Sequence, residues 1–263
     1  MLRILFVGDV MGNPGRRALS KLLGALCSRL DVHFVVANGE NAAGGLGITK
    51  TTAAAILDAG VDVITLGNHA FSQKNIFACI ESEPRIIRPA NYPPGVPGRG
   101  WGVFETRTGE HIAVANLAGR TFMAPLDCPF RTADSILAEI GGRPRTLLVD
   151  MHAEATSEKA ALGWYLDGRA SAVVGTHTHV QTSDERVLPG GTAYITDVGM
   201  TGVLDSVLGL DKDQVIERFL TQVTGKFKPA DGRVTLQGVV VEIDPETGRA
   251  KSIQRANIAE DES

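Results

Sequence analysis

The chain has 263 residues, and its 26 Lys and Arg are outnumbered by 30 Asp and Glu, which gives a formal net charge of −4. Proteins that bind DNA or RNA mainly through phosphate contacts usually have a clear basic excess, so this composition argues against a general nucleic-acid binder. Hydrophobic residues make up 43% of the chain, which is enough for a buried core, and we expect a single domain over residues 1–263.

The cysteines and the apolar runs bear on the compartment. Cys27, Cys79 and Cys128 are widely spaced and include no Cys-x-x-Cys pair, so the sequence predicts neither a disulfide framework nor a thiolate zinc site. The first apolar run ends at Gly8 and is too short for a signal-peptide core, and no run approaches the ~20 apolar residues of a membrane span. We therefore expect a cytoplasmic location and no membrane partner.

Short apolar runs alternate with helical patterns in the first third of the chain. Thr49 can cap a helix that ends before Gly60, and the leucines that follow Pro14 recur at helical spacing. We predict strands at residues 4–7, 34–37 and 63–66, and helices at residues 16–30, 49–59 and 76–80. This alternation of strands and helices favours a parallel sheet covered by helices.

The middle of the chain begins with residues 88–100, whose four prolines and three glycines predict a loop. Residues 118–131 are predicted to form a second long loop, near a site or a contact surface. Residues 234–253 are predicted to form a β-hairpin with a turn of Asp, Pro and Gly at 244–248. Further strands are expected at residues 103–105, 112–117, 147–149, 172–174 and 193–195, and further helices at residues 132–140, 156–166 and 211–220.

Five of the predicted strands are followed by polar side chains that can bind a metal ion. In an open α/β sheet the carboxyl ends of parallel strands lie along one edge, where ligands bind, so we expect these side chains to form one site. They are Asp9 after the first strand, Glu40 and Asn41 after the second, Asn68 and His69 after the third, His152 after residues 147–149, and His177 and His179 after residues 172–174.

The residue types at these positions indicate the chemistry. Carboxylates, amides and imidazoles without a thiolate suit Mn, Fe, Zn or Co better than calcium or a structural zinc. The set is larger than one tetrahedral ion needs. Two ions ~3.5–4 Å apart that share a bridging carboxylate are a recurrent arrangement for hydrolysing phosphate esters. The sequence therefore predicts a site for two divalent transition-metal ions.

Other motifs in the chain match known catalytic patterns less well. Residues 44–51 are glycine-rich, but Thr49 precedes Lys50 where a phosphate-binding P-loop needs glycine. No G-x-S-x-G string is present, which argues against a serine hydrolase. Glu154, Glu158 and Lys159 could orient the His152 imidazole or form the solvated start of a helix, and we favour the second interpretation.

The polar blocks resemble those of a known group of enzymes. Gly8-Asp9, Gly39-Glu40-Asn41, Gly67-Asn68-His69, His152 and residues 175–179 resemble the successive motifs of the calcineurin-like metallophosphoesterase superfamily. Residues 38–45, 88–93, 152–159 and 196–202 resemble a narrower bacterial branch that hydrolyses 2′,3′-cyclic AMP. The resemblance covers nearly the whole chain. It implies an α/β fold, a four-layer α/β/β/α sandwich with two central mixed sheets.

The resemblance also implies a role for each residue of the site. The superfamily usually has Asp-x-His in the first motif, whereas this chain has Asp9-Val10-Met11, so Asn41 is the candidate for the missing ligand. Its alternative role is to bond the backbone. The missing histidine and the glutamate at the position of the usual bridging aspartate are two features in which the chain resembles the narrower branch. For that branch iron is the expected metal, and manganese or zinc are alternatives. The ligands implied are Asp9 and His179 for the first ion, Asn68, His152 and His177 for the second, and Glu40 as the bridge.

The implied activity is hydrolysis of small cyclic nucleotides, 2′,3′-cyclic AMP first, by attack of a dimetal-bridging hydroxide on phosphorus. His69 would act as general acid and protonate the leaving oxygen. The alternatives are a phosphomonoesterase or protein phosphatase with the same ions, and a regulatory module that binds a nucleotide or RNA through the metals. We expect a small phosphodiester as partner, no DNA, RNA only as an alternative, and a homo-oligomer.

Overall fold

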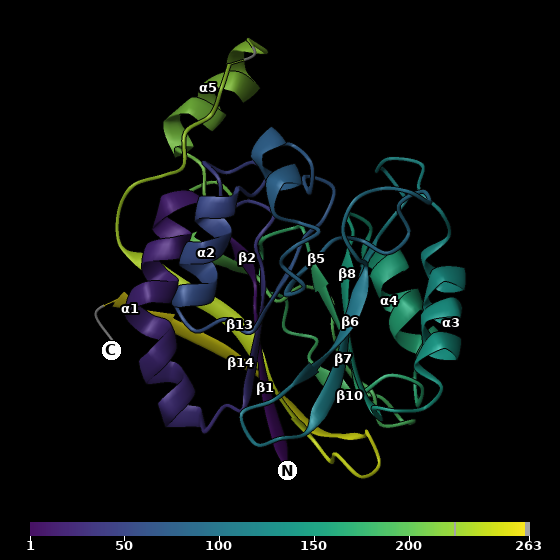
Figure 1. The fold of residues 1–263 in the computed structure, drawn as a ribbon. Helices are drawn as coiled ribbons and strands as arrows, with labels where there is room; N and C mark the ends of the chain where they lie inside the picture. The colour runs from purple at the N-terminus through teal and green to yellow at the C-terminus, as the bar shows by residue number, and fades with distance from the viewer. Residues whose placement is uncertain (224, 261–263) are drawn as a thin grey trace.

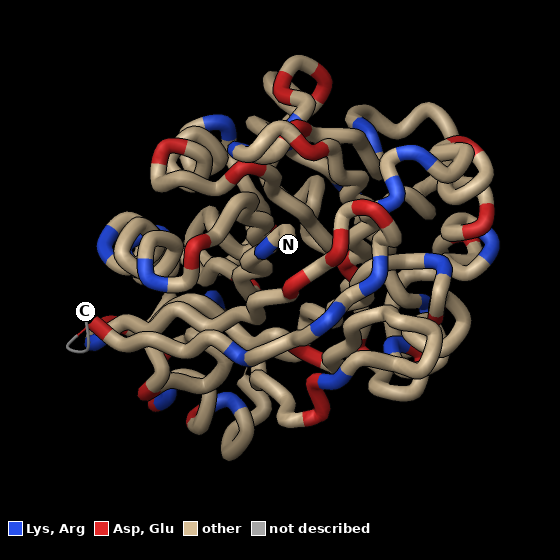
Figure 2. Tube along the Cα trace, turned by 90° about the horizontal axis from the view of Figure 1, so that it is seen from below, with Lys and Arg blue, Asp and Glu red and all other residues tan. Residues whose placement is uncertain are grey.

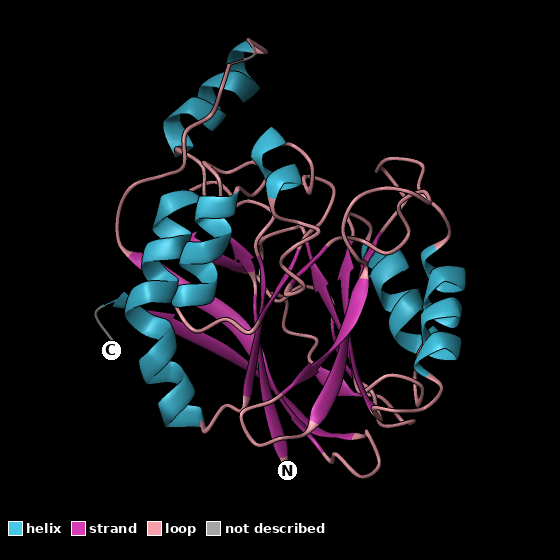
Figure 3. Ribbon diagram, in the orientation of Figure 1, coloured by secondary structure: helices cyan, strands magenta, loops and turns pink. Residues whose placement is uncertain are grey.

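Two β-sheets lie face to face in the computed structural model, with helices on the outer side of each sheet (Figure 1). The structure describes residues 1–223 and 225–260. Figure 3 shows the layers by type of element, helix, sheet, sheet and helix, which confirms the expected α/β/β/α sandwich. Within these described residues, no helix is long and apolar enough to cross a membrane.

The first sheet has eight strands and is mixed. Its centre is parallel from β1 to β5, and β13 pairs antiparallel with both β1 and β14. The order is β2-β12-β13-β1-β3-β4-β5, with β14 beside β13. The strands are β1 (Leu2–Val7), β2 (Asp9–Val10), β3 (Phe34–Asn38), β4 (Val63–Thr65), β5 (Ile86–Ile87), β12 (Met200–Val203), β13 (Val234–Ile243) and β14 (Ala250–Ala259).

The second sheet has six strands in the order β10-β11-β9-β8-β7-β6. Its four central strands are parallel, and the two edge strands pair antiparallel with their neighbours. The strands are β6 (Trp101–Glu105), β7 (His111–Ala118), β8 (Thr146–His152), β9 (Ala172–Thr176), β10 (Arg186–Val187) and β11 (Ala193–Ile195).

The central strands are buried on both faces, which explains why they have nearly continuous apolar sequences. In β1, Ile4 and Phe6 point into the core between the two sheets, where they join Val114 and Leu148 of the second sheet. Leu5 points to the opposite face and packs with the helices outside the first sheet. Side chains alternate between the two faces of a strand, so one strand contributes to two cores.

Four helices cover the outer faces of the sheets. The helices α1 (Gly12–Leu30) and α2 (Lys50–Asp58) pack on the first sheet, while α3 (Pro129–Ile140) and α4 (Thr156–Tyr165) pack on the second. Thr49 is the N-cap of α2, as predicted, and forms a capping box with Thr52. The short 3₁₀ helix η1 (Lys74–Ala78) follows β4, and α5 (Lys212–Thr221) projects away from the rest of the molecule (Figure 1).

All of the predicted strands and helices are present, with several corrections at their ends. The helices α1 and α3 start earlier than predicted, at Gly12 and Pro129, because proline is tolerated in the first turn of a helix. The helix predicted at residues 76–80 is a 3₁₀ helix at Lys74–Ala78. Four strands of two to four residues were not predicted (β2, β5, β10 and β12), since such short segments carry no periodic signal.

Charged residues are mixed on the end of the molecule that holds the N-terminus. Seen from this end, Lys and Arg are interspersed with Asp and Glu (Figure 2). Mixed signs at this end agree with the net charge of −4.

Candidate metal centre

The predicted site residues meet where the parallel strands of both sheets end. Asp9 follows β1 and His152 ends β8, so they come from different sheets that face each other. The remaining predicted residues follow β3, β4 and β9. The strands β3 and β4 run parallel to β1, and β9 runs parallel to β8, so their carboxyl ends lie at the same edges as those of β1 and β8. The two sheets thus place polar side chains from five strand ends together.

Glu40, His152 and His177 form the tightest part of this site. Nε2 of His152 lies 3.0 Å from Oε1 of Glu40 and 3.0 Å from Nδ1 of His177. Each of the three residues offers a ligand atom within 4.8 Å of the other two. Oδ1 of Asn68 lies 3.0 Å from the same Nε2 atom. The residues predicted for the second ion and for the bridge are therefore brought together.

The residues predicted for the first ion lie beside this group. Nε2 of His179 is 3.7 Å from Oδ1 of Asp9 and 3.1 Å from Nδ2 of Asn41. The same Asn41 amide lies 3.4 Å from Oε1 of Glu40. Only an amide oxygen can bind a cation, so Asn41 would bind one after a 180° turn of its amide group. Glu40 lies between the two groups, as expected for a bridging carboxylate.

Two observations indicate that these residues fit divalent cations. Oδ1 of Asp9 is buried and has no hydrogen-bond partner among the described residues, and a buried carboxylate oxygen without a partner is costly unless a cation or donor satisfies it. Gly67 provides the second observation, because a Cβ atom there would lie 2.3 Å from Nε2 of His152 and 2.4 Å from Oε2 of Glu40. A glycine at this position leaves room around the ligand atoms.

The pKa values of the site reflect its buried charges. Burial would raise the pKa of Glu40, but attraction to His152 and His69 outweighs it and lowers the pKa to about 2. Burial would lower the pKa of His152, but Glu40 and Asp9 raise it to about 9. Burial and the neighbouring His152 lower the pKa of His177 to about 3. At neutral pH the imidazole of His152 therefore carries a positive charge. The imidazole of His177 is neutral, which is the form that binds metals.

A buried carboxylate beneath the site, Asp150, orients His152. Asp150 accepts hydrogen bonds from the hydroxyls of Thr65 at 2.5 Å and Thr176 at 2.7 Å, and from the Asn38 amide at 3.1 Å. The Thr176 hydroxyl lies 2.9 Å from Nδ1 of His152. With Nδ1 engaged, Nε2 faces the other ligands, which is how such partners orient metal-binding imidazoles. Burial raises the pKa of Asp150 to about 6.

A buried ion pair supports the loop that carries His177 and His179. Lys159 is 1% exposed and donates to Oδ2 of Asp197 at 2.9 Å. The same oxygen accepts from the backbone N–H of Thr178 at 3.0 Å and from its hydroxyl at 2.6 Å. Both histidines beside Thr178 have positive φ angles, 96° and 63°, which are strained for residues other than glycine.

These contacts correct the favoured interpretation of the charged residues after His152. Lys159 is buried rather than solvated, and Oε2 of Glu154 lies 3.0 Å from Nε2 of His177. Glu158 accepts hydrogen bonds from the backbone of Arg120 and Thr121 at 3.1 Å. The prediction of a solvated helix start was therefore wrong for Lys159 and Glu158, which contact other segments of the chain, whereas Glu154 and the first two residues of α4 are exposed.

His69 lies next to the ligand cluster. Its backbone N–H donates to Oε2 of Glu40 at 2.9 Å, which fixes the loop after β4. Its Nε2 atom lies 3.3 Å from the amide nitrogen of Asn68, and its side chain is partly exposed. The imidazole is thus placed beside the site rather than in its centre.

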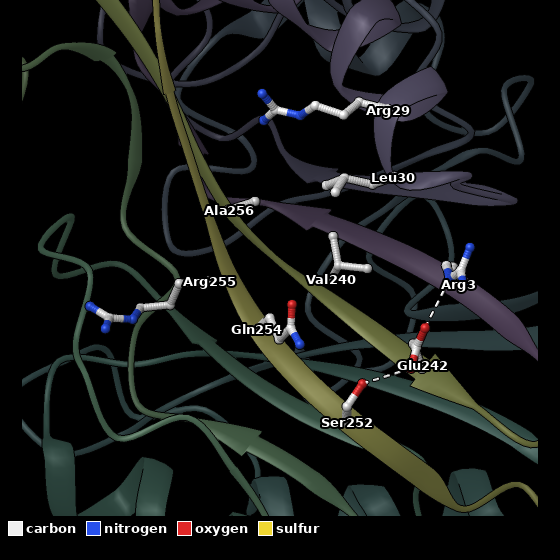
Figure 4. Close-up of a pocket in the computed structure, with 9 residues that line it drawn as sticks. All are labelled: Arg3, Arg29, Leu30, Val240, Glu242, Ser252, Gln254, Arg255 and Ala256. Atoms are coloured by element: carbon white, nitrogen blue, oxygen red, sulfur yellow. Dashed lines mark hydrogen bonds and ion pairs between the residues drawn. The ribbon is translucent and has the colours of Figure 1, made fainter. Parts of the chain in front are cut away.

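A separate cavity of about 320 Å³ lies near the opposite end of β1 (Figure 4). Arg3 and Glu242 line it and bond each other at 2.8 Å, and Glu242 also accepts from Ser252. Arg255 bonds Glu185 at 2.8 Å. Because two of the three arginines that line the cavity are already paired with carboxylates, the cavity is a weaker candidate for binding a phosphate than the cluster at the strand ends.

The chain is similar to known proteins over nearly its whole length. A family model described as YmdB-like protein matches residues 5–256. The 2′,3′-cyclic-nucleotide 2′-phosphodiesterase of Bacillus subtilis (strain 168) is 51% identical over 260 residues, which cover 99% of this chain and 98% of that protein. The crystal structure of a hypothetical protein from Thermus thermophilus is 45% identical with a TM-score of 0.92, covering 98% of this chain and 99% of that one.

Two further solved structures bear on the fold. A phosphatase from Mycoplasma pneumoniae is 33% identical with a TM-score of 0.91, over 98% of this chain and 93% of that one. The calcineurin-like phosphoesterase YfkN from Bacillus subtilis is 12% identical with a TM-score of 0.58, over 98% of this chain and 90% of that one. At that identity the similarity concerns the fold alone, and it confirms the fold that the sequence motifs predicted.

Proposed function

The chain belongs to the YmdB-like protein family, and on that premise we propose that it is a metal-dependent phosphodiesterase that hydrolyses small cyclic nucleotides, 2′,3′-cyclic AMP first among them. The observation that carries this proposal is the convergence of Glu40, His152 and His177 beside the buried Oδ1 atom of Asp9, which accepts no hydrogen bond from the residues that the structure describes. Such nitrogen and oxygen donors suit divalent transition metals. The name of the Bacillus subtilis relative, which is 51% identical, supports the choice of substrate.

The proposed cofactor is a pair of divalent ions, iron in the cell, with manganese or zinc as substitutes. Glu40 would bridge the ions, because its Oε1 atom lies close to both His152 and Asn41. When bound, two such ions supply a nucleophile at neutral pH and neutralise charge on the phosphoryl oxygens. The proposed ligands are Asp9, Asn41 and His179 on one side of Glu40, and Asn68, His152 and His177 on the other.

The chain itself supplies the proton for the leaving group. Cleavage of the cyclic ester leaves negative charge on a ribose oxygen, and a neighbouring imidazole can protonate it. His69 is held beside the cluster through its backbone bond to Glu40, and its ring is partly exposed. We assign the general-acid role to His69.

Substrate comparison tests this proposal. Metal-loaded protein is incubated with 2′,3′-cyclic AMP, 3′,5′-cyclic AMP and p-nitrophenyl phosphate, and the products are separated by chromatography. We expect rapid conversion of 2′,3′-cyclic AMP to 3′-AMP. Preference for p-nitrophenyl phosphate would instead identify a phosphomonoesterase or protein phosphatase. Tight binding of a nucleotide or an RNA end without turnover of any substrate would identify a regulatory module.

The proposed partner is a small phosphodiester, with neither DNA nor a membrane, and RNA only as the alternative. The excess of acidic residues over the whole chain supports the exclusion of DNA. The proposed compartment is the cytoplasm. All three cysteines are free thiols, as is usual in a reducing compartment.

We also propose that the chain forms a homo-oligomer through α5. Ile216, Phe219 and Leu220 are 51%, 76% and 80% exposed, and their spacing places them on one stripe of a helix that projects from the molecule (Figure 1). Two copies packed antiparallel would cover each other's stripes. Lys212 of each copy would then lie at the C-terminal end of the other helix, where carbonyl groups carry partial negative charge.

A further inference from the structure

Three aromatic side chains form a cluster beside the proposed metal centre. The rings of Phe71 and Phe77 are stacked with centroids 5.3 Å apart, and the rings of Phe71 and Tyr92 meet edge to face at a centroid distance of 5.6 Å and an angle of 82°. Aromatic residues make up only 5% of the chain. A contact cluster of three at the edge of the site is therefore a specific local feature.

Phe71 is tied closely to the proposed general acid. It lies two positions after His69, so their Cα atoms are at most about 7.6 Å apart. The loop between them is fixed by hydrogen bonds from Ala70 N–H to the Gly67 carbonyl and from Ser72 N–H to the His69 carbonyl, at 3.1 and 3.0 Å. These bonds hold the backbone that carries Phe71 beside His69.

Tyr92 is brought to the same place from another part of the chain. The Asn91 side chain accepts from the backbone N–H of Ala118 at 2.9 Å and donates to the Ala118 carbonyl at 2.8 Å. Ala118 ends β7, and its register partner on the neighbouring strand is His152. The loop that carries Tyr92 is therefore anchored beside one of the proposed ligands.

The Tyr92 hydroxyl is available to a ligand. It makes no hydrogen bond to any residue within 1–223 or 225–260, and its side chain is half-buried. Burial and the carboxylate of Glu40 both raise the pKa of the Tyr92 phenol, while Arg88 lowers it. The motif at residues 88–93, which has no role among the ligands, thus directs an aromatic ring to the site.

We propose that Tyr92 forms the subsite for the nucleobase of the cyclic nucleotide, with Phe71 holding the Tyr92 ring in place and Phe77 supporting Phe71. A flat heteroaromatic base gains stacking energy on an aromatic side chain without needing a matching set of hydrogen bonds. A purine has a larger flat surface than a pyrimidine and therefore stacks better on an aromatic side chain. The inference rests on the proposed function, because it assigns the substrate's base to the same site.

Kinetics with a base-free substrate test the subsite. Wild type, Tyr92→Leu and Tyr92→Phe are assayed with 2′,3′-cyclic AMP, 2′,3′-cyclic CMP and glycerol 1,2-cyclic phosphate, which has the same five-membered ester and no base. We expect Tyr92→Leu to raise KM for cyclic AMP about tenfold, to reduce the preference for adenine, and to leave kcat/KM for the glycerol ester within about twofold of wild type. Tyr92→Phe keeps the ring and should retain most of the affinity.

Tyr165→Leu is the matched control. Tyr165 meets Phe130 edge to face with centroids 5.3 Å apart, in nearly the same geometry, on the outer side of the second sheet. The Tyr165→Leu substitution should leave KM for all three substrates unchanged. Circular dichroism melting curves establish that each variant is folded.

Each outcome decides the proposal. Equal loss of activity toward the nucleotides and the glycerol ester in Tyr92→Leu, or no loss toward any, would overturn the subsite while the phosphodiesterase proposal stands. If wild type hydrolyses none of the three, the proposed function fails. The subsite is then decided by calorimetric titration with 3′-AMP: weaker binding to Tyr92→Leu than to wild type supports it, and equal binding overturns it.

Discussion

Nε2 of His152 lies 3.0 Å from Oε1 of Glu40, and neither side chain is more than 1% exposed. Burial alone would raise the pKa of Glu40 and lower that of His152, but their mutual attraction reverses both directions, to about 2 and about 9. In the metal-free protein at neutral pH the pair is therefore a carboxylate and an imidazolium. A metal ion bound at Nε2 would replace the proton of that imidazolium.

Metal binding is expected to release about one proton from His152 at pH 7.5, because a metal-binding imidazole must be neutral. His177, whose pKa is lowered to about 3, is already neutral and contributes none. Titration calorimetry of metal-free protein with Mn²⁺ in two buffers of different ionisation enthalpy measures the number released. A binding enthalpy that is the same in both buffers would contradict the protonation of His152.

His69 and His177 are expected to fail in different ways when replaced. His69→Ala should keep its metal and lose about 10²- to 10⁴-fold in kcat, since a general acid contributes on that order. His177→Ala should lose metal, because it removes a nitrogen that lies 3.0 Å from Nε2 of His152. Elemental analysis and kinetics of both variants measure this, with the exposed His111→Ala as control. Equal loss of metal from both variants would refute the division of roles.

The ion pair of Lys159 and Asp197 is expected to be important for stability. Lys159→Met leaves the Asp197 carboxylate buried without its cation, which typically costs about 3–5 kcal/mol. The exposed pair of Arg169 and Asp134 is the control, since both side chains are 41% exposed and Arg169→Met should cost less than about 1 kcal/mol. Urea unfolding at pH 7 compares the two. Equal destabilisation would show that burial of the pair carries no special weight.

The positions of the proposed ligands could be predicted from the sequence, because they depend on local signals. Buried strands stand out as short apolar runs, and the polar residue after each run lies at a strand end whatever the remaining topology is. This reasoning places Asp9 and His152 together, although they come from different sheets. The single parallel sheet favoured by the alternation of strands and helices was wrong, since the structure has two mixed sheets. The site still forms because the parallel strands of both sheets end at the same edge.

The supporting residues could not be predicted, because their environment is formed by distant segments. Asp150 lies within an apolar strand, and its partners Thr65 and Asn38 come from the facing sheet, 85 and 112 positions away. Lys159 has the sequence context of an exposed helix residue and is buried by Asp197. Tyr92 is in a loop without periodicity, and its proximity to Phe71 follows from the way the loop is anchored to Ala118.

The exposed stripe on α5 is expected to hold copies of the chain together. Phe219→Glu places a charge in the middle of the stripe and should shift the protein toward the monomer, as measured by light scattering coupled to size-exclusion chromatography. Phe122→Glu is the matched control, because Phe122 is 89% exposed and lies in the loop between β7 and α3 rather than on α5. A monomeric wild type, or an unchanged mass in Phe219→Glu, would contradict self-association through this helix.

Gly67→Ala is expected to damage the metal centre with little change in structure elsewhere. The added methyl carbon would lie 2.3 Å from Nε2 of His152 and 2.4 Å from Oε2 of Glu40, distances that side-chain atoms do not tolerate, so one of these two ligands must move. Gly24→Ala is the matched control: it adds the same group inside α1, where nothing lies within 4 Å, and should stabilise the helix by about 0.5–1 kcal/mol. Metal content and melting temperature measure both effects. Because cations bind only where several ligand atoms converge, we expect Gly67→Ala to lose most of its metal, and full metal occupancy in this variant would mean that Glu40 and His152 do not share an ion.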